Sequence, residues 1–212
     1  MNSNHNHQIT QIMSRHVPEA AQAYCIDLWL QHPFSLHITP KRISKLGDYR
    51  YHKKKNTHII TLNATLNPYS FLITYLHEIA HLIAFQKYGF KIAPHGAAWK
   101  KSFQQLMEPM LHAHVFPQDV LRPLKKYMLN PKAASGSDHR LSLALQNYDQ
   151  QDGSVPLSKI QPEQTFQFRD MVFVKETVRR TRALCRDLDS GKRYLVSEIA
   201  RVQLIREEIS DE

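Results

Sequence analysis

The chain has 212 residues, 42% of them hydrophobic and 22% charged, with a net charge of +9 at neutral pH. This composition is typical of a globular protein with room for one substantial core and a small second one, and it excludes wholesale disorder. The two cysteines, Cys25 and Cys185, exclude a disulfide framework or a cysteine-based zinc site, so any metal site must use histidines and carboxylates.

The first half of the chain predicts a mixture of helices and strands. Apolar residues at helical spacing predict a helix over residues 19–31. Alternating segments predict strands over residues 35–40, 45–52 and 57–64, the last two joined by the polar turn KKKN. Asn67 and Pro68 predict the start of a long helix, and Gly89 predicts its end near Tyr88. Shorter helices are expected over residues 96–111, 118–129 and 141–148.

The C-terminal part of the chain, from residue 165 on, has a different residue pattern. Residues 165–212 consist of short β-rich segments, and DSGK at residues 189–192 is typical of a hairpin turn. We therefore expect an α+β chain with a first domain over residues 1–131, a linker with one short helix over 132–164, and a small all-β, SH3-like barrel over 165–212. An open sheet is the alternative to the barrel, because both have the same sequence pattern.

The predicted long helix carries titratable side chains in an otherwise apolar stretch, YLHEIAHLIAF. His77 and His81 are four residues apart, so their imidazoles lie on one helix face and can reach one ion. Glu78 points about 100° away around the axis. From there it can act as a base toward a metal-held water. Such groups are costly to bury without partners, so the HExxH pattern favours a zinc site over two core histidines.

A catalytic zinc usually has three protein ligands, and this helix supplies two. His95 is the favoured third ligand, because the chain reverses at Gly89 and a short connector can bring it back to the same face. Trp99 could then form a wall of the site. Glu108, on the following predicted helix, is the alternative ligand. The remaining histidines that we considered are expected at the surface or at helix ends: His112, His114 and His139.

The stretch HEIAH, followed after thirteen residues by HGAAWK, resembles the SprT-like metalloprotease domain of bacterial SprT proteins and eukaryotic Spartan. The connector YGFKIAPHGAAWK is similar to the family pattern FGxxAPHGxxWK, and the resemblance extends over about residues 20–115. It implies a zincin-like fold, Zn²⁺ bound by His77, His81 and His95, and Glu78 as the catalytic acid/base. Many members carry a cysteine-rich zinc ribbon after this domain, and here the β-rich tail takes its place.

The resulting interpretation is a hydrolase: a zinc metalloprotease that cleaves peptide bonds with a zinc-bound water activated by Glu78. The expected partners are a protein substrate and DNA, single-stranded or crosslinked to protein. We expect the substrate to lie as a strand beside residues 57–64, taken as a sheet edge. Tyr75 and Tyr88 are candidates for stabilising the oxyanion.

Two other functions fit parts of the sequence. One is a nucleic-acid-binding or regulatory protein with a structural zinc site, which would have no need for the base Glu78. The other is a metal-dependent nuclease, but such enzymes more often use carboxylate-rich magnesium sites. The polar N-terminal segment does not resemble a signal peptide, and the longest apolar run is too polar to span a membrane. A cytoplasmic protein without membrane contact is therefore expected.

Two basic clusters are candidates for nucleic-acid contacts. Between residues 36 and 58 there are seven cations and one acid, 7 − 1 = +6, interleaved with tyrosines that suit exposed bases. Residues 165–206 have ten cations and five acids, 10 − 5 = +5. A solvated hairpin tip, and a tail that docks on the first domain, are the alternatives. The candidate contacts are Lys41, Arg42, Lys45, Arg50, Lys53, Lys54, Lys55, Arg179, Arg180 and Arg182.

Overall fold

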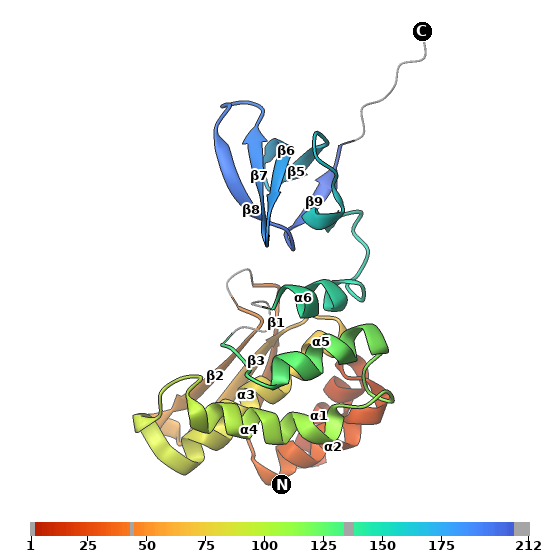
Figure 1. The fold of residues 1–212 in the computed structure, drawn as a ribbon. Coiled ribbons are helices and arrows are strands. Elements are labelled where there is room, and N and C mark those ends of the chain that lie inside the picture. Colours follow the sequence, from red (N-terminus) through yellow and green to blue (C-terminus); the bar gives the residue numbers. More distant parts are fainter. Residues whose placement is uncertain (1–2, 43–44, 134–137, 206–212) are drawn as a thin grey trace. The chain divides into compact units, whose positions relative to one another are not determined.

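The computed structural model describes residues 3–42, 45–133 and 138–205, without the side chains of residues 3–6 (Figure 1). The chain divides into two compact units, residues 1–149 and 150–212. Within the described residues there are six α-helices, a three-stranded sheet and a separate six-stranded antiparallel sheet, so the α+β prediction is confirmed. The expected linker over residues 132–164 is shared between the units: α6 (His139–Gln146) lies in the first and β4 (Val155–Pro156) in the second.

The sheet of the first unit contains β1 (Ser35–Thr39), β2 (Gly47–His52) and β3 (Thr57–Asn63) in the order β1-β3-β2. β2 and β3 form the predicted antiparallel hairpin, around the 3-10 turn η1 (Lys53–Lys55). β1 pairs with β3 in parallel on the other side. The expectation that residues 57–64 form a sheet edge is therefore wrong, because β3 has a partner on both sides. β2 is the edge strand on the side of the candidate site.

The helices of the first unit are α1 (Ser3–His16), α2 (Glu19–Gln31), α3 (Pro68–Tyr88), α4 (Ala97–Met107), α5 (Gln118–Met128) and α6. α3 begins as predicted: the Asn67 side chain accepts a hydrogen bond from the Ser70 backbone N–H at 2.9 Å. It ends at Gly89, whose φ of 64° lies in the left-handed region. α1 was not expected, because its first residues are polar. None of the described helices is long and apolar enough to cross a membrane.

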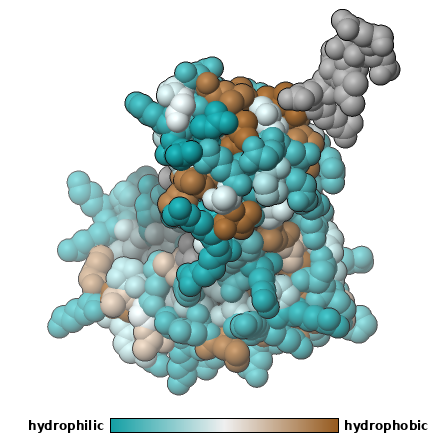
Figure 2. Space-filling model, turned by 45° about the horizontal axis from the view of Figure 1, so that its top comes forward, coloured by the Kyte–Doolittle hydropathy of each residue, from teal (hydrophilic) through white to brown (hydrophobic). Residues whose placement is uncertain are grey.

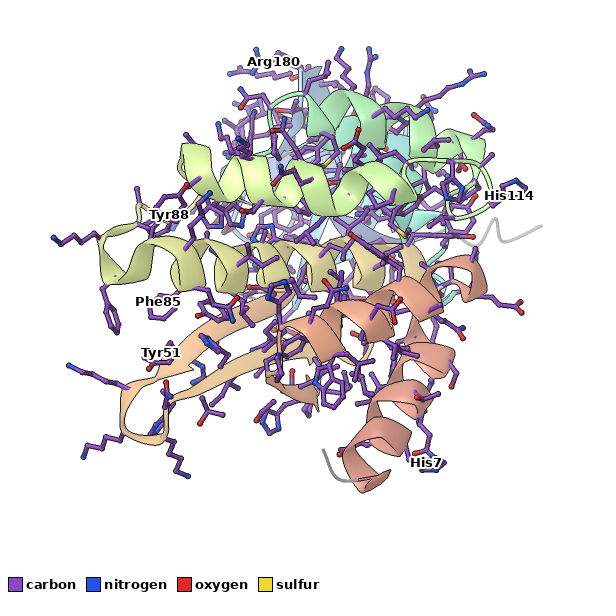
Figure 3. The ribbon with its side chains drawn as sticks, turned by 90° about the horizontal axis from the view of Figure 1, so that it is seen from below. His7, Tyr51, Phe85, Tyr88, His114 and Arg180 are labelled. Atoms are coloured by element: carbon purple, nitrogen blue, oxygen red, sulfur yellow. The ribbon has the colours of Figure 1, made fainter. Side chains whose placement is uncertain are left out.

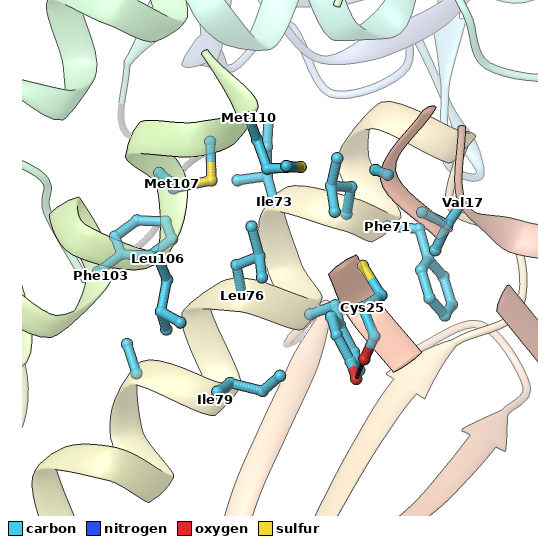
Figure 4. Close-up of a cluster of buried hydrophobic side chains, with 14 of the residues drawn as sticks. Val17, Cys25, Phe71, Ile73, Leu76, Ile79, Phe103, Leu106, Met107 and Met110 are labelled. Atoms are coloured by element: carbon cyan, nitrogen blue, oxygen red, sulfur yellow. Dashed lines mark hydrogen bonds between the residues drawn. The ribbon is translucent and has the colours of Figure 1, made fainter. Parts of the chain in front are cut away.

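The core of the first unit surrounds α3 (Figure 4). Phe71, Leu76 and Ile79 on this helix are fully buried, and Phe103 of α4 packs into the same cluster. Fully burying an apolar side chain of this size stabilises a fold by about 1.5–3 kcal/mol. Tyr75 is also fully buried, and its hydroxyl donates to the backbone carbonyl of Cys25 at 2.8 Å. This contact removes Tyr75 from the candidates for oxyanion stabilisation. α3 is thus a rigid support whose other face can carry a site.

The second unit is an antiparallel sheet with the strand order β4-β9-β5-β6-β7-β8. Its further strands are β5 (Thr165–Phe168), β6 (Met171–Arg179), β7 (Arg182–Asp187), β8 (Arg193–Ser197) and β9 (Arg201–Leu204). The predicted DSGK turn joins β7 to β8, and its Gly191 has a φ of 66°. A small core of its own includes Phe166, Phe173 and Val202. Some apolar side chains of this unit stay at the surface (Figure 2). Leu195 is an exposed apolar residue of β8.

Candidate metal centre

Three imidazoles converge on one point beside α3. The Nε2 atoms of His77 and His81 are 3.3 Å apart, those of His81 and His95 3.0 Å, and those of His95 and His77 3.2 Å. The first two project from one face of α3, as their spacing predicts. Within the described residues this is the one group of three or more metal-ligating side chains, and it could hold a metal ion.

The donor set fits a zinc-type ion. Three ring nitrogens facing one another at this range cannot all be hydrogen-bonded to each other, and their lone pairs repel unless a cation lies between them. Nitrogens about 2.0–2.1 Å from one tetrahedral zinc are themselves about 3.3 Å apart, close to the observed spacings. Imidazole suits zinc and similar transition metals, whereas magnesium and calcium prefer oxygen ligands. The residues present therefore fit the group that the HExxH pattern implies.

His95 is brought to the other two histidines by an unusual backbone. η2 (Gly89–Lys91) reverses the chain after α3, and α4 begins at Ala97, directly after the cap residue Gly96. His95 between them has a φ of 58°, in the left-handed region that non-glycine residues seldom occupy. Such strained residues concentrate at functional sites, where the surrounding structure holds them. This backbone places Nε2 of His95 3.0 Å from that of His81 and 3.2 Å from that of His77.

Trp99 forms a wall of the cluster, as expected from the sequence. Its side chain is fully buried, and its ring centroid lies 4.7 Å from that of His77, 5.4 Å from His81 and 4.7 Å from His95. The indole N–H donates to the backbone carbonyl of His77 at 3.3 Å. One rigid side chain on α4 thus packs against all three imidazoles and restricts their rotamers.

Glu78 lies against the backbone of β2. A backbone N–H of Tyr49 hydrogen-bonds to its carboxylate. A Cβ placed on Gly47 would come within 2.7 Å of Glu78 Oε1 and 2.7 Å of Thr74 Cγ2. Gly47 has no positive φ, so it is required here for space and not for backbone conformation. The glycine lets α3 approach the edge strand closely enough for the strand to hold the carboxylate.

Burial changes the pKa values in this site. It raises the pKa of Glu78 to about 8, with a further rise from the negative charge of Asp48, while the Tyr49 N–H and two nearby cations act in the opposite direction. Burial lowers the pKa of His77 to about 3 and that of His81 to about 4, and each is lowered further by charge on neighbouring imidazoles. Burial also lowers the pKa of His95. All three histidines are thus neutral at neutral pH, as metal binding requires.

A cavity of about 650 Å³ gives access to these groups. The three histidines, Glu78 and Trp99 line it, together with residues 45–49 on and before β2. The connector also lines it, at Ile92, Ala93 and Pro94. A cavity of this size, with convergent polar groups, is the usual form of a binding or active site.

The other candidate ligands lie elsewhere. Glu108, the alternative third ligand, is exposed in η3 (Glu108–Met110) and lines a different, smaller hollow. His112 and His114 are exposed, and Figure 3 shows His114 at the opposite end of α3 from Tyr88. His139 is the first residue of α6. Tyr88 is 49% exposed and does not line the cavity, so it is not placed to stabilise an oxyanion there.

The cations of the first basic cluster have different surroundings. Arg42 is bound to β3, donating to Asn63 Oδ1 at 2.8 Å and to Thr61 Oγ1 at 3.0 Å. Lys45 and Arg50 form ion pairs with Asp48 at 2.7 and 2.9 Å. Lys41 and the three lysines of η1 are exposed. In the second cluster, Arg179, Arg180 and Arg182 are exposed at the β6–β7 hairpin.

Sequence reasoning did not identify two parts of the site, Gly47 and Tyr49. Tyr49 lines the cavity, stacks parallel to His81 at 6.4 Å between centroids, and its hydroxyl lies 2.9 Å from Nδ1 of His58. Its alternation with Tyr51 on an edge strand next to the motif helix could have indicated it. Gly47 had no local signal, because its role depends on how closely α3 approaches.

Residues 20–120 match the model of the SprT-like family. The matched segment contains β1 to β3, α3, the connector and α4, and with them all three histidines, Glu78 and Gly47. Searches of curated proteins and of solved structures gave no significant match. This segment, just under half of the chain, is a SprT-like family domain.

Proposed function

We propose that the protein is a zinc-dependent metallopeptidase with Glu78 as its general acid/base. The observation that carries the proposal is the convergence of three neutral imidazoles, 3.0–3.3 Å apart at Nε2, in a cavity that a buried carboxylate also lines. Zinc sites with three protein ligands leave a fourth position open and are typically catalytic. A structural site has no use for a carboxylate held beside it, which favours the enzyme over a purely regulatory role.

His77, His81 and His95 would hold the ion, which when bound supplies a Lewis acid for water and a peptide carbonyl. The positive charge of a bound ion would favour the ionised form of Glu78 over the protonated form that burial favours in the metal-free protein. The carboxylate then accepts a proton from the attacking water as the water oxygen bonds to the carbonyl carbon. It then gives that proton to the departing amine as the C–N bond breaks. The Tyr49 backbone N–H and the space at Gly47 keep the carboxylate oriented during both transfers.

We further propose that Tyr49, and not Tyr75 or Tyr88, supports the developing oxyanion. Its side chain lines the cavity beside His81. Burial raises the pKa of Tyr49 well above its ordinary value, so the hydroxyl keeps its proton. To donate to the oxyanion, this hydroxyl would turn from Nδ1 of His58, its side-chain partner at 2.9 Å, whereas the Tyr75 hydroxyl is buried on a backbone carbonyl away from the cavity. The substrate would lie extended along the free edge of β2, whose backbone can pair with any sequence.

We propose a zincin-like arrangement for the first unit and an SH3-like barrel for the second. A small sheet whose edge strand runs beside the HExxH helix supports the first. The short antiparallel strands around a compact apolar core support the second.

DNA-associated or DNA-crosslinked proteins are the proposed substrates. Exposed lysines at the β2–β3 hairpin and exposed arginines at the β6–β7 hairpin support contact with phosphates. Replacing Lys53, Lys54 and Lys55 by Glu in one variant, and Arg179, Arg180 and Arg182 in another, separates the two clusters. We expect at least one variant to weaken binding to a single-stranded oligonucleotide and to flatten its salt dependence. Unchanged binding in both would contradict these contacts.

The test of the activity compares the zinc-loaded wild type with Glu78→Gln on a DNA-bound protein, with and without single-stranded DNA. Loss of the base should slow cleavage by about 10²–10⁴-fold while the protein keeps its zinc. Fragments produced equally by both proteins would indicate a contaminating protease and contradict the proposal. Bound zinc without any cleavage would favour the alternative, a nucleic-acid-binding or regulatory protein with a structural metal site.

A further inference from the structure

A group of aromatic rings lies at the C-terminal end of α3, and one of them, Phe85, lines the cavity. The ring centroids of Tyr51 and Phe85 are 4.7 Å apart, those of Phe85 and Phe90 5.0 Å, and those of Tyr51 and Phe90 5.9 Å. We call these three residues the aromatic shelf. Phe90 is 72% exposed, which is unusual for a large apolar side chain held in place by ring contacts. In Figure 3, Phe85 and Tyr51 lie on the same side of α3, facing the hairpin.

The aromatic shelf is continuous with the cavity. Phe85 lines the cavity and belongs to the shelf, and its centroid is 6.1 Å from that of Tyr49, which also lines the cavity. Phe90 is held over Phe85 by the chain reversal at Gly89, with the two rings edge to face at 89°. The shelf therefore extends the cavity wall outward and is not a separate surface patch.

The two-residue repeat of β2 indicates which side chain of an extended peptide would reach the shelf. Tyr49 lies beside His81, and Tyr51 follows it on the same face of the strand, about 7 Å further along. A peptide paired with the edge of β2 has the same repeat, so its alternate side chains meet this face. The side chain about two residues from the bond at the metal centre would therefore contact the shelf.

We infer that Tyr51, Phe85 and Phe90 bind a large apolar side chain of the polypeptide substrate, about two residues from the cleaved bond. This inference rests on the proposed function and names a specificity site for it. If the substrate runs antiparallel to β2, the preferred residue lies on the N-terminal side of the bond, because β2 runs from Gly47 beside Glu78 toward the shelf. A parallel substrate would place it on the C-terminal side.

A nucleic-acid base is the competing occupant. Lys53, Lys54 and Lys55 are exposed at the tip of the same hairpin, and aromatic rings near cations bind single strands. Continuity with the cavity wall favours the peptide side chain, because a base on the shelf would lie where the substrate has to pass. The experiment distinguishes the two occupants.

The test uses the full-length protein, unfolded β-casein as substrate, and the variants Phe90→Ser and Tyr88→Ser. Tyr88 is the matched control: an exposed ring two residues away, which Figure 3 shows on the other side of α3 from Phe85. Cut sites are read by mass spectrometry. The wild type and Tyr88→Ser should prefer Phe, Leu, Met or Tyr at one position about two residues from the cut. Phe90→Ser should lose about tenfold or more of that preference.

Binding of β-casein by the same variants in the Glu78→Gln background gives a readout that does not need cleavage. The inference expects weaker binding with Phe90→Ser than with Tyr88→Ser, and this result would support the shelf even if the wild type cleaves nothing and the proposed activity fails. Equal cut-site profiles and equal binding for the two variants would overturn it. Weaker binding of a thymidine oligonucleotide by Phe90→Ser, with β-casein binding and cut sites unchanged, would overturn it in favour of a base.

Discussion

Both units bury titratable groups, but the polar partners of these groups differ between the two units. In the second unit, the ammonium of Lys175 is almost inaccessible and has three partners: the carbonyls of Leu157 and Ile160, each at 2.8 Å, and Glu198 Oε1 at 3.1 Å. In the first unit, three imidazoles have mainly one another as polar partners and face a cavity. A buried charge with a full set of bonds is part of the fold. Groups that face each other around a cavity indicate a ligand that completes them.

We expect the largest loss of stability from breaking the buried ion pair between Lys175 and Glu198 in the second unit. Lys175→Ala leaves Glu198 buried without its partner, so we expect the free energy of unfolding of the second unit to fall by about 3–5 kcal/mol. Lys175→Met combined with Glu198→Leu should recover part of this loss, and zinc affinity should not change. Hydrogen exchange would localise the change to β6 and residues 157–160. A normal exchange pattern in Lys175→Ala would show that the ion pair does not hold this unit together.

The three-histidine cluster should make the metal-free first unit less stable in acid. The pKa values of His77 and His81 lie below their ordinary value in the folded state, so the unfolded chain takes up protons first as pH falls below about 6.5. Their contribution to stability is therefore complete above that pH and is lost toward about 4. The raised pKa of Glu78 acts in the opposite direction, because the folded chain gains that proton first.

The Glu78→Gln variant separates these two contributions. Without Glu78, unfolding free energy should fall by about 2–4 kcal/mol from pH 7 to pH 5, and the wild type should lose less. Denaturant unfolding of both metal-free proteins at the two pH values measures the difference. If the unfolding free energy fell by the same amount from pH 7 to pH 5 in both proteins, the pKa assignments would be contradicted.

The close approach of α3 to β2 predicts a smaller effect from one methyl group. Gly47→Ala places a Cβ against Glu78 and Thr74, so we expect a loss of about 1–3 kcal/mol and slower cleavage with zinc affinity kept. In a Glu78→Ala, Thr74→Ser background the same substitution should cost less, because the colliding atoms are gone. A cost that stays the same in that background would place the effect of Gly47 elsewhere.

The smallest predicted effect concerns the backbone of His95. In the metal-free protein, His95→Gly should be about 1 kcal/mol more stable than His95→Ala, because glycine adopts a positive φ without strain. Both variants lack the imidazole, so their zinc affinities should fall alike. Thermal unfolding of the two, side by side, measures the difference. Equal stability would mean that the left-handed turn at His95 stores no strain.

Local signals were sufficient to predict much of the first unit. Asn67 and Gly89 predicted both ends of α3, and the four-residue spacing of His77 and His81 predicted their shared face. The reversal at Gly89 correctly suggested that His95 returns to them. These features depend on residues close in sequence, whose geometry is set by capping and by helical periodicity.

What the sequence could not predict depends on long-range contacts. Alternation does not specify which strands pair, so the sequence does not show that β3 is a central strand with β1 as its second partner. Arg42 was counted as a surface cation, but Asn63 and Thr61 bind it to β3. No sequence pattern distinguishes Gly47 from other strand glycines, because its role comes from the close approach of α3. Each of these three features depends on contacts between segments that are far apart in the sequence, and local sequence patterns do not predict such contacts.

Zinc titration into the metal-free protein tests the central claim most directly. Wild type and Glu78→Gln should each bind one ion with similar affinity, whereas His95→Ala should bind at least about tenfold more weakly, since one of three ligands is gone. Wild-type affinity in His95→Ala, or a comparable loss of affinity in Glu78→Gln, would contradict a site in which three imidazoles hold the metal and the carboxylate serves the reaction.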